Sequence, residues 1–152
     1  MQLNRLFSLF DDLVIKYSLE KIKTIGDCYM LAGGLPMPLS NHADSVAKMA
    51  LDMLDTIEQI NTKTNQSLKI RIGINSGPVS AGVIGKEKFI YDLWGDTVNV
   101  ASRMESFGAN DKIHVSSSTY LQLKDQYLFS KRNKIIIPGK GQMQTYFLTA
   151  RK

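Results

Sequence analysis

The sequence has few of the residues that build disulfide frameworks and metal cages. It contains one cysteine and two histidines among 152 residues. Cys28 therefore has no partner for an internal disulfide bond, and no Cys/His spacing indicates a zinc site. No apolar run approaches the roughly 20 residues that cross a bilayer, and the start of the chain lacks the apolar core of a signal peptide. We expect that this segment makes no membrane contact and lies in the cytoplasm. It could do so as the intracellular domain of a larger membrane or multidomain protein.

The charge is modest and argues against an extended nucleic-acid interface. A net charge of +5 suits a small anionic ligand such as a nucleotide, and the aromatic pattern of RNA-binding sheets is absent. With 43% hydrophobic and 22% charged residues, the chain reads as one globular domain over residues 1–152. His42 and His114 are far apart in the sequence, and neither lies near a serine-nucleophile motif. We therefore predict that His42 is a loop residue and His114 a strand residue, and that neither is catalytic.

Periodicity predicts an α+β protein. Amphipathic helices are expected from Leu3 to Val14 and from Ala43 to Ile57, the second with Asn41 as its cap. A short helix is predicted at 116–123. Alternating apolar residues bounded by turn residues predict strands at 20–25, 28–32, 68–75, 79–84, 112–115, 127–130, 135–138 and 145–148. The charged run 131–134 is predicted to be a solvated turn. Hairpins interleaved with helices favour a sandwich with a mostly antiparallel sheet.

The stretch from Phe89 to Glu105 predicts a strand that turns into a helix. Asp96 follows Gly95 and is a candidate N-cap. The helix has three apolar residues that can face a core, namely Val98, Ala101 and Met104. Asn99 and Arg103, spaced i and i+4, fall on the opposite face. These two residues either belong to the solvent-exposed face of an amphipathic helix or form part of a binding site.

The same stretch resembles the signature of class III nucleotidyl cyclases. The residues that carry the resemblance are Tyr-Asp-Leu-Trp-Gly-Asp-Thr-Val-Asn-Val-Ala-Ser-Arg-Met, at positions 91–104. The resemblance covers nearly the whole chain and implies a ferredoxin-like α/β sandwich, the class III cyclase fold, lacking its first strand. It implies that Asn99 orients the ribose and that Arg103 stabilises the α-phosphate in the transition state.

A second block, Lys-Thr-Ile-Gly-Asp-Cys-Tyr-Met at positions 23–30, also resembles the cyclases. There the resemblance implies that Asp27 binds both catalytic metal ions, two Mg²⁺ or Mn²⁺. The alternative reading needs no ligand, because Gly-Asp is a favourable two-residue hairpin turn.

The resemblance further assigns base recognition to Lys23 and Asp92, with Leu93 beside them in the substrate site. A lysine can donate to N1 of adenine, and a carboxylate can accept from its amino group. Guanylate cyclases instead resemble one another in placing Glu and usually Cys at these positions, so ATP is favoured over GTP. The simpler interpretation of Lys23 is a strand lysine whose ammonium reaches water.

Together these motifs imply an adenylate cyclase that converts ATP to 3′,5′-cyclic AMP and pyrophosphate. The resemblance also implies a head-to-tail homodimer with active sites at its interface. Two alternatives remain open: a guanylate cyclase, and a non-catalytic cyclase-like module for dimerisation or nucleotide binding.

Two departures from the family pattern limit this interpretation. The family's first metal-binding Asp precedes the first helix, and no equivalent is present, so we expect an N-terminally truncated domain that is weakly active or inactive, with a regulatory domain upstream. Near the C-terminus, the first lysine of the family's Lys-Gly-Lys-Gly is replaced by Pro138. Lys140 is then either a partial substitute that binds the terminal phosphates or a solvated turn residue.

Overall fold

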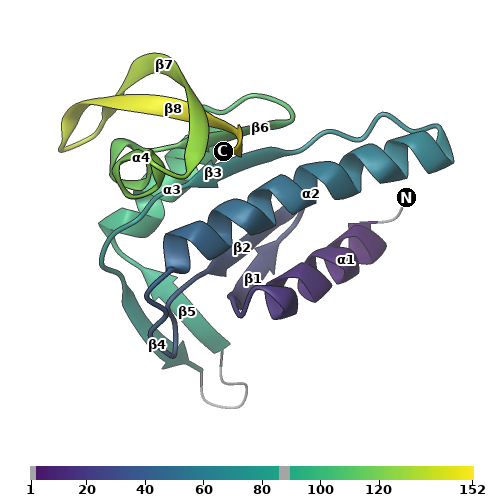
Figure 1. Cartoon of the computed structure of the whole chain (residues 1–152). Coiled ribbons are helices and arrows are strands. Elements are labelled where there is room, and N and C mark those ends of the chain that lie inside the picture. Colours follow the sequence, from purple (N-terminus) through teal and green to yellow (C-terminus); the bar gives the residue numbers. More distant parts are fainter. Residues whose placement is uncertain (1–2, 86–89) are drawn as a thin grey trace. The chain divides into compact units, whose positions relative to one another are not determined.

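The computed structural model describes residues 3–85 and 90–152. Contacts divide the chain into two compact units, Met1–Leu68 with Gly82–Asp92 and Lys69–Ala81 with Leu93–Lys152. The elements (Figure 1) are α1 Leu3–Lys16, β1 Glu20–Ile25, β2 Cys28–Ala32, α2 His42–Thr64, β3 Arg71–Ile74, β4 Ser80–Ile84, β5 Ile90–Trp94, α3 Asp96–Ser106, β6 Lys112–Val115, α4 Ser117–Leu123, β7 Tyr127–Ile137 and β8 Gly141–Arg151. Strands β4 and β5 pair with each other, and two of the unit boundaries fall inside them.

In the first unit, α1 packs against both α2 and the β1–β2 hairpin. The helix buries an apolar stripe, made of Leu6, Phe10 and Val14. The rings of Phe7 and Phe10 lie 5.2 and 5.8 Å from the ring of Tyr29 on β2, both edge-on. Asn41 occupies the N-cap position of α2, although its side chain makes no capping hydrogen bond. His42, which was predicted to lie in a loop, is the first residue of that helix.

The predicted hairpin of β1 and β2 is confirmed. The strands pair antiparallel with Ile25 opposite Cys28, which leaves Gly26 and Asp27 as a two-residue turn. Gly26 has a φ of +58°, a left-handed conformation that glycine adopts without strain. The turn therefore holds the Asp27 side chain at an exposed tip.

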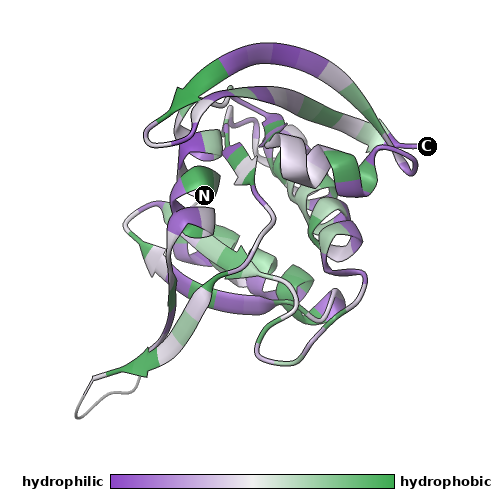
Figure 2. Ribbon diagram, turned by 90° about the vertical axis from the view of Figure 1, so that its left-hand side faces the viewer, coloured by the Kyte–Doolittle hydropathy of each residue, from purple (hydrophilic) through white to green (hydrophobic). Residues whose placement is uncertain are grey.

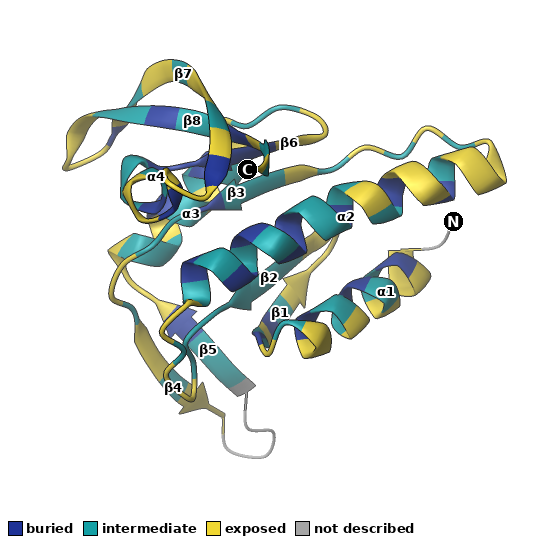
Figure 3. Ribbon diagram, viewed as in Figure 1, coloured by how far each residue is buried: buried dark blue, intermediate teal, exposed yellow. Residues whose placement is uncertain are grey.

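The second unit is built on a four-stranded sheet in the order β3-β6-β8-β7. The pair β3–β6 is parallel, whereas β6–β8 and β7–β8 are antiparallel, as a mostly antiparallel sheet requires. Helix α3 buries Val100 and Met104 against Ile137. Other buried apolar side chains come from β6, α4, β7 and β8 (Figure 3): Ile113, Val115, Leu123, Tyr127 and Leu148.

The prediction of a turn at 131–134 is wrong, because β7 runs through this segment. Figure 2 shows the strand with a hydrophilic middle and a hydrophobic end. Side chains of β8 also bond the backbone there: Thr145 Oγ1 donates to Asn133 O at 2.9 Å, and the Gln144 amide donates to Arg132 O. A register irregularity between Arg132 and Ile135 absorbs the extra residue, while most of the charged side chains stay exposed. The actual turn lies at 138–140, between β7 and β8.

His114, correctly predicted to be a strand residue, lies on β6 and is completely buried. Its Nδ1 lies 2.8 Å from Met104 O, and since a carbonyl only accepts, Nδ1 carries the proton and donates. Nε2 is buried and has no hydrogen-bond partner among the described residues. Burial lowers the pKa of His114; the bond to Met104 O opposes this shift, and the positive charge of Arg132 adds to it. The folded protein therefore holds this imidazole in its neutral form.

This neutral histidine predicts a loss of stability on mild acidification. Below about pH 6.5 the unfolded chain binds a proton at this residue more readily than the folded chain, because the folded pKa is lowered, so stability falls as the pH drops, by up to about 1.4 kcal/mol per pH unit. Urea unfolding between about pH 7.5 and 5.5 measures the slope. His114→Phe should flatten it, whereas His42→Gln should not. Equal slopes for wild type and His114→Phe would contradict the assignment.

Candidate active site

Lys23 and Asp92 form an ion pair within the first unit. Lys23 Nζ lies 2.9 Å from Asp92 Oδ2, and the side chains are 33% and 19% exposed. β1 supplies the lysine and β5 the carboxylate, from positions 69 residues apart in sequence. Each side chain is thus held by its partner rather than extended into water. The arrangement places a hydrogen-bond donor beside an acceptor at a partly buried position. A role of this pair in base recognition stays a prediction.

Asp27 fits a hard cation as one of its ligands. Its carboxylate is exposed at the tip of a two-residue turn. Magnesium is usually held by one or two carboxylates together with substrate phosphates and water. Over residues 3–85 and 90–152, no group of three or more His, Cys, Asp or Glu side chains is placed to hold a metal ion. The contribution of Asp27 to metal binding stays a prediction.

Helix α3 presents Asn99 and Arg103 to a pocket in the second unit. The pocket has a volume of about 470 Å³ and is lined by Asp96, Asn99, Val100, Ser102, Arg103, Ser106, Phe107, Ile137 and Pro138. Its apolar lining combines the buried side chains of Val100 and Ile137 with Phe107 and Pro138. Asn99 is exposed and Arg103 is half-buried, so an amide and a guanidinium face solvent from the same side of the helix. The predicted pairing of these two side chains on one face is confirmed.

Two details of the predicted helix are wrong. Asp96 is the first residue of α3 and not its cap, because the N-cap position is Gly95, with a φ of +116°. The buried residues are Val100 and Met104, spaced i and i+4, whereas Val98 is only half-buried. Of the three predicted core residues, Met104 is buried, and packing against Ile137 buries Val100 in place of Val98.

Lys140 lies at the turn between β7 and β8 and pairs with the first residue of α3. Its Nζ is 2.6 Å from Asp96 Oδ2, with side chains 46% and 58% exposed. Asp96 lines the pocket, so the ammonium lies close to it. Because both groups are well exposed, the pair contributes little to stability. A role for Lys140 in phosphate binding is compatible with this position and stays a prediction.

The structure divides the predicted site residues between the two units. Lys23, Asp27 and Asp92 belong to the first unit. The second unit holds Leu93, Asn99, Arg103 and Lys140. Leu93 is 5% exposed, so its side chain is part of the interior. Its predicted contact with substrate remains untested.

Sequence reasoning missed Ser102 and Ser106 as pocket residues. Both lie on the face of Asn99 and Arg103 at helical spacing, so the signal was present but ambiguous. It also missed Asn75, which is bonded to α3 although 22 residues separate it from its partner Thr97. No local pattern reveals that contact.

Comparison with known proteins identifies the family. The model for the adenylate and guanylate cyclase catalytic domain matches residues 1–150. The chain therefore belongs to this family. It is 45% identical over 150 residues to an adenylate cyclase of Mycobacterium tuberculosis and 45% identical over 148 residues to the guanylate cyclase soluble subunit beta-2 of Homo sapiens. These matches cover 99% and 96% of this chain, but only 34% and 24% of the two relatives.

A solved structure confirms the fold. The guanylate cyclase domain of RhGC from Catenaria anguillulae, in complex with GTP, superposes with a TM-score of 0.92 at 43% identity. The match covers 99% of this chain and 82% of that one. The expected class III cyclase fold is thus present. No helix within the described residues has both the length and the hydropathy to cross a membrane.

Proposed function

We propose that this chain is the catalytic part of an adenylate cyclase, which converts ATP to 3′,5′-cyclic AMP and pyrophosphate. The observation that carries the choice of ATP is the ion pair of Lys23 with Asp92 at 2.9 Å. Relatives of both specificities match at the same identity, so similarity alone does not decide between them.

The pair favours adenine through its donors and acceptors. The ammonium of Lys23 donates only, which suits the acceptor N1 of adenine, and the carboxylate of Asp92 accepts, which suits the exocyclic amine. In the same orientation, guanine would set its N1–H donor against the lysine and its O6 acceptor against the carboxylate. Leaving such partly buried groups unpaired is costly, so discrimination of several powers of ten is attainable.

The α3 residues would act on the sugar and phosphate. In the reaction the ribose 3′-oxygen forms a bond to the α-phosphorus, the bond from that phosphorus to the bridging oxygen breaks, pyrophosphate leaves with the electron pair, and the hydroxyl proton is lost. Asn99 would orient the ribose, and Arg103 would stabilise the charge that moves onto the phosphate oxygens. Lys140 would bind the terminal phosphates after exchanging Asp96 for them.

Asp27 would be the chain's ligand to two Mg²⁺ or Mn²⁺ ions. When bound, such ions neutralise phosphate charge and acidify the attacking hydroxyl. In the proposed assembly, a head-to-tail homodimer, Asp27 of one copy serves the same nucleotide as Lys23, Asp92, Asn99 and Arg103 of the other.

Product analysis tests the proposal. This chain and a version extended at the N-terminus by the Asp-bearing segment of the family are incubated with ATP or GTP and Mn²⁺ or Mg²⁺, and the products are separated by chromatography. We expect cyclic AMP from the extended version and little from the chain itself. Cyclic GMP as the main product would make it a guanylate cyclase. ATP binding without any cyclic product would support the non-catalytic module instead.

A further inference from the structure

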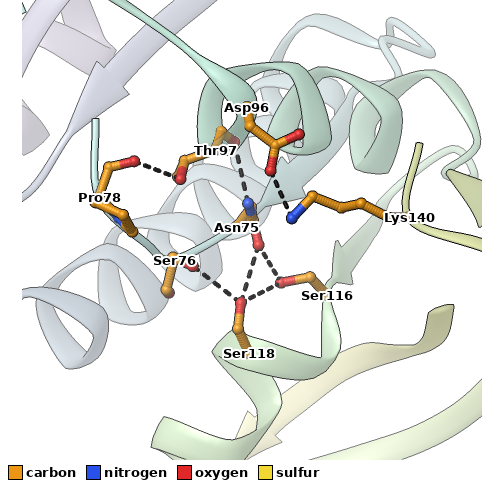
Figure 4. Close-up of polar contacts among 8 residues, drawn as sticks. All are labelled: Asn75, Ser76, Pro78, Asp96, Thr97, Ser116, Ser118 and Lys140. Carbon is orange, nitrogen blue, oxygen red and sulfur yellow. Dashed lines mark hydrogen bonds and ion pairs between the residues drawn. The ribbon is translucent and has the colours of Figure 1, made fainter. Parts of the chain in front are cut away.

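Asn75, the residue after β3, joins three elements of the second unit through its side chain (Figure 4). Its Oδ1 accepts from Ser116 Oγ at 2.6 Å and from Ser118 Oγ at 3.0 Å. Its Nδ2 donates to Thr97 O, in the first turn of α3, at 3.0 Å. Ser116 is the N-cap of α4, and its hydroxyl also accepts from Thr119 N. The amide therefore links the end of β3 to the beginnings of α3 and α4.

The beginning of α3 depends on this link because the helix has no side-chain cap of its own. Its N-cap residue is Gly95, which makes no side-chain capping bond. Two hydrogen bonds of Thr97 hold the first turn instead: its carbonyl accepts from Asn75, and its hydroxyl donates to Pro78 O at 2.5 Å. Both connect the first turn of α3 to the segment that follows β3. Asn99 comes two residues later, and its N–H donates to Gly95 O at 3.1 Å.

The rest of α3 is fixed by a different contact. A Cβ on Gly73 of β3 would lie 2.1 Å from Glu105 N and 2.7 Å from Ala101 O, so the helix backbone rests directly on the strand. Arg71 Nε also lies 3.0 Å from Glu105 Oε2. These contacts hold the second half of the helix. The first turn, next to Asn99, is held by the bonds of Thr97.

We propose that Asn75 is a positioning residue for the cyclase reaction. By holding the first turn of α3, it sets the position of Asn99, and to a smaller degree that of Arg103, against the nucleotide. The inference rests on the proposed function. Displacing a catalytic group by about 1 Å costs on the order of 100-fold in rate, so a single hydrogen bond away from the substrate has a measurable effect.

Asn75→Asp isolates the link to α3. The carboxylate keeps the size of the amide and still accepts from Ser116 and Ser118, but it has no N–H and faces the carbonyl of Thr97. Ser76→Ala is the matched control. This substitution, at the residue next to Asn75, removes the 2.8 Å hydrogen bond between Ser76 Oγ and Thr119 Oγ1. It leaves the hydrogen bonds of Asn75 in place.

The test has two arms. In the first, amide hydrogen exchange of the nucleotide-free chain should be faster at residues 99–101 in Asn75→Asp than in wild type or Ser76→Ala. In the second, the extended version carrying Asn75→Asp should lose roughly 10- to 100-fold in kcat, with KM changed by no more than about threefold. Lowering the pH protonates the Asp carboxylate introduced at position 75 and gives it a hydrogen-bond donor again. The ratio of mutant to wild-type kcat should therefore rise as the pH falls.

The outcomes separate this inference from the proposed function. Unchanged kcat, or a loss that appears equally in Ser76→Ala, would overturn the positioning role while wild type still makes cyclic AMP. If wild type makes no cyclic nucleotide, the proposed function and the catalytic role fail together, and the exchange arm still shows whether the amide holds α3. Should Asn75→Asp not fold, Asn75→Ser, whose side chain is too short to keep the bond to Thr97 O, takes its place, and a kcat equal to wild type there would also overturn the inference.

Discussion

Replacing Lys23 by Glu together with Asp92 by Cys is expected to move the preference of the extended version from ATP to GTP. Glu accepts from the N1–H of guanine, and the thiol donates weakly to O6. The donor at position 23 thus becomes an acceptor, and the acceptor at position 92 becomes a donor. We expect kcat/KM for ATP to fall by at least about 10³-fold, because the two partly buried side chains and the adenine groups that face them would no longer form hydrogen bonds. Initial rates with ATP and GTP, followed by product chromatography, measure the change.

A matched pair elsewhere in the first unit serves as the control. Lys48 Nζ lies 2.9 Å from Asp44 Oδ2 within α2, with side chains 30% and 19% exposed, nearly the geometry and burial of the Lys23–Asp92 pair. Lys48→Glu with Asp44→Cys should leave the preference for ATP intact. A similar loss in both double variants would show that the first pair matters for stability and not for base selection. Retention of ATP specificity after the Lys23 and Asp92 exchange would contradict the proposal directly.

Features encoded by neighbouring residues were predictable from the sequence. The Gly26-Asp27 turn follows from two residues, and both strands of its hairpin were predicted with the observed bounds. The same holds for Asn99 and Arg103, whose shared face follows from a spacing of four. These predictions succeeded because local conformation and packing agree there.

Features set by distant partners were not predictable. The charged run 131–134 satisfies the local criteria for a turn, yet β7 continues through it because β8 supplies the hydrogen bonds. Val100, and not Val98, lies in the core, because Val100 packs with Met104 against Ile137. Asn75 lies in a sequence that reads as a strand followed by a turn, and only the fold brings its amide to Thr97.

The second large effect concerns Asp27 and Arg103, which we assign to different copies of the chain. Asp27→Asn would weaken binding of the proposed metal ions, and Arg103→Ala would remove the proposed contact to the α-phosphate, so each should lower kcat of the extended version by about 10²–10³-fold. Thermal unfolding should change little, because Asp27 is exposed at a turn and Arg103 lies on the pocket face. Ser102→Ala, on the same face of α3, is the control for loss of a pocket side chain.

Mixing the two variants tests the shared site most directly. If one copy supplies Asp27 and the other supplies Arg103, a mixed dimer contains one intact site and one doubly altered site. An equimolar mixture of Asp27→Asn and Arg103→Ala should then recover up to about a quarter of the wild-type rate of cyclic AMP formation. A mixture no more active than the separate variants, under conditions where light scattering shows dimers that exchange subunits, would contradict an active site built from two copies.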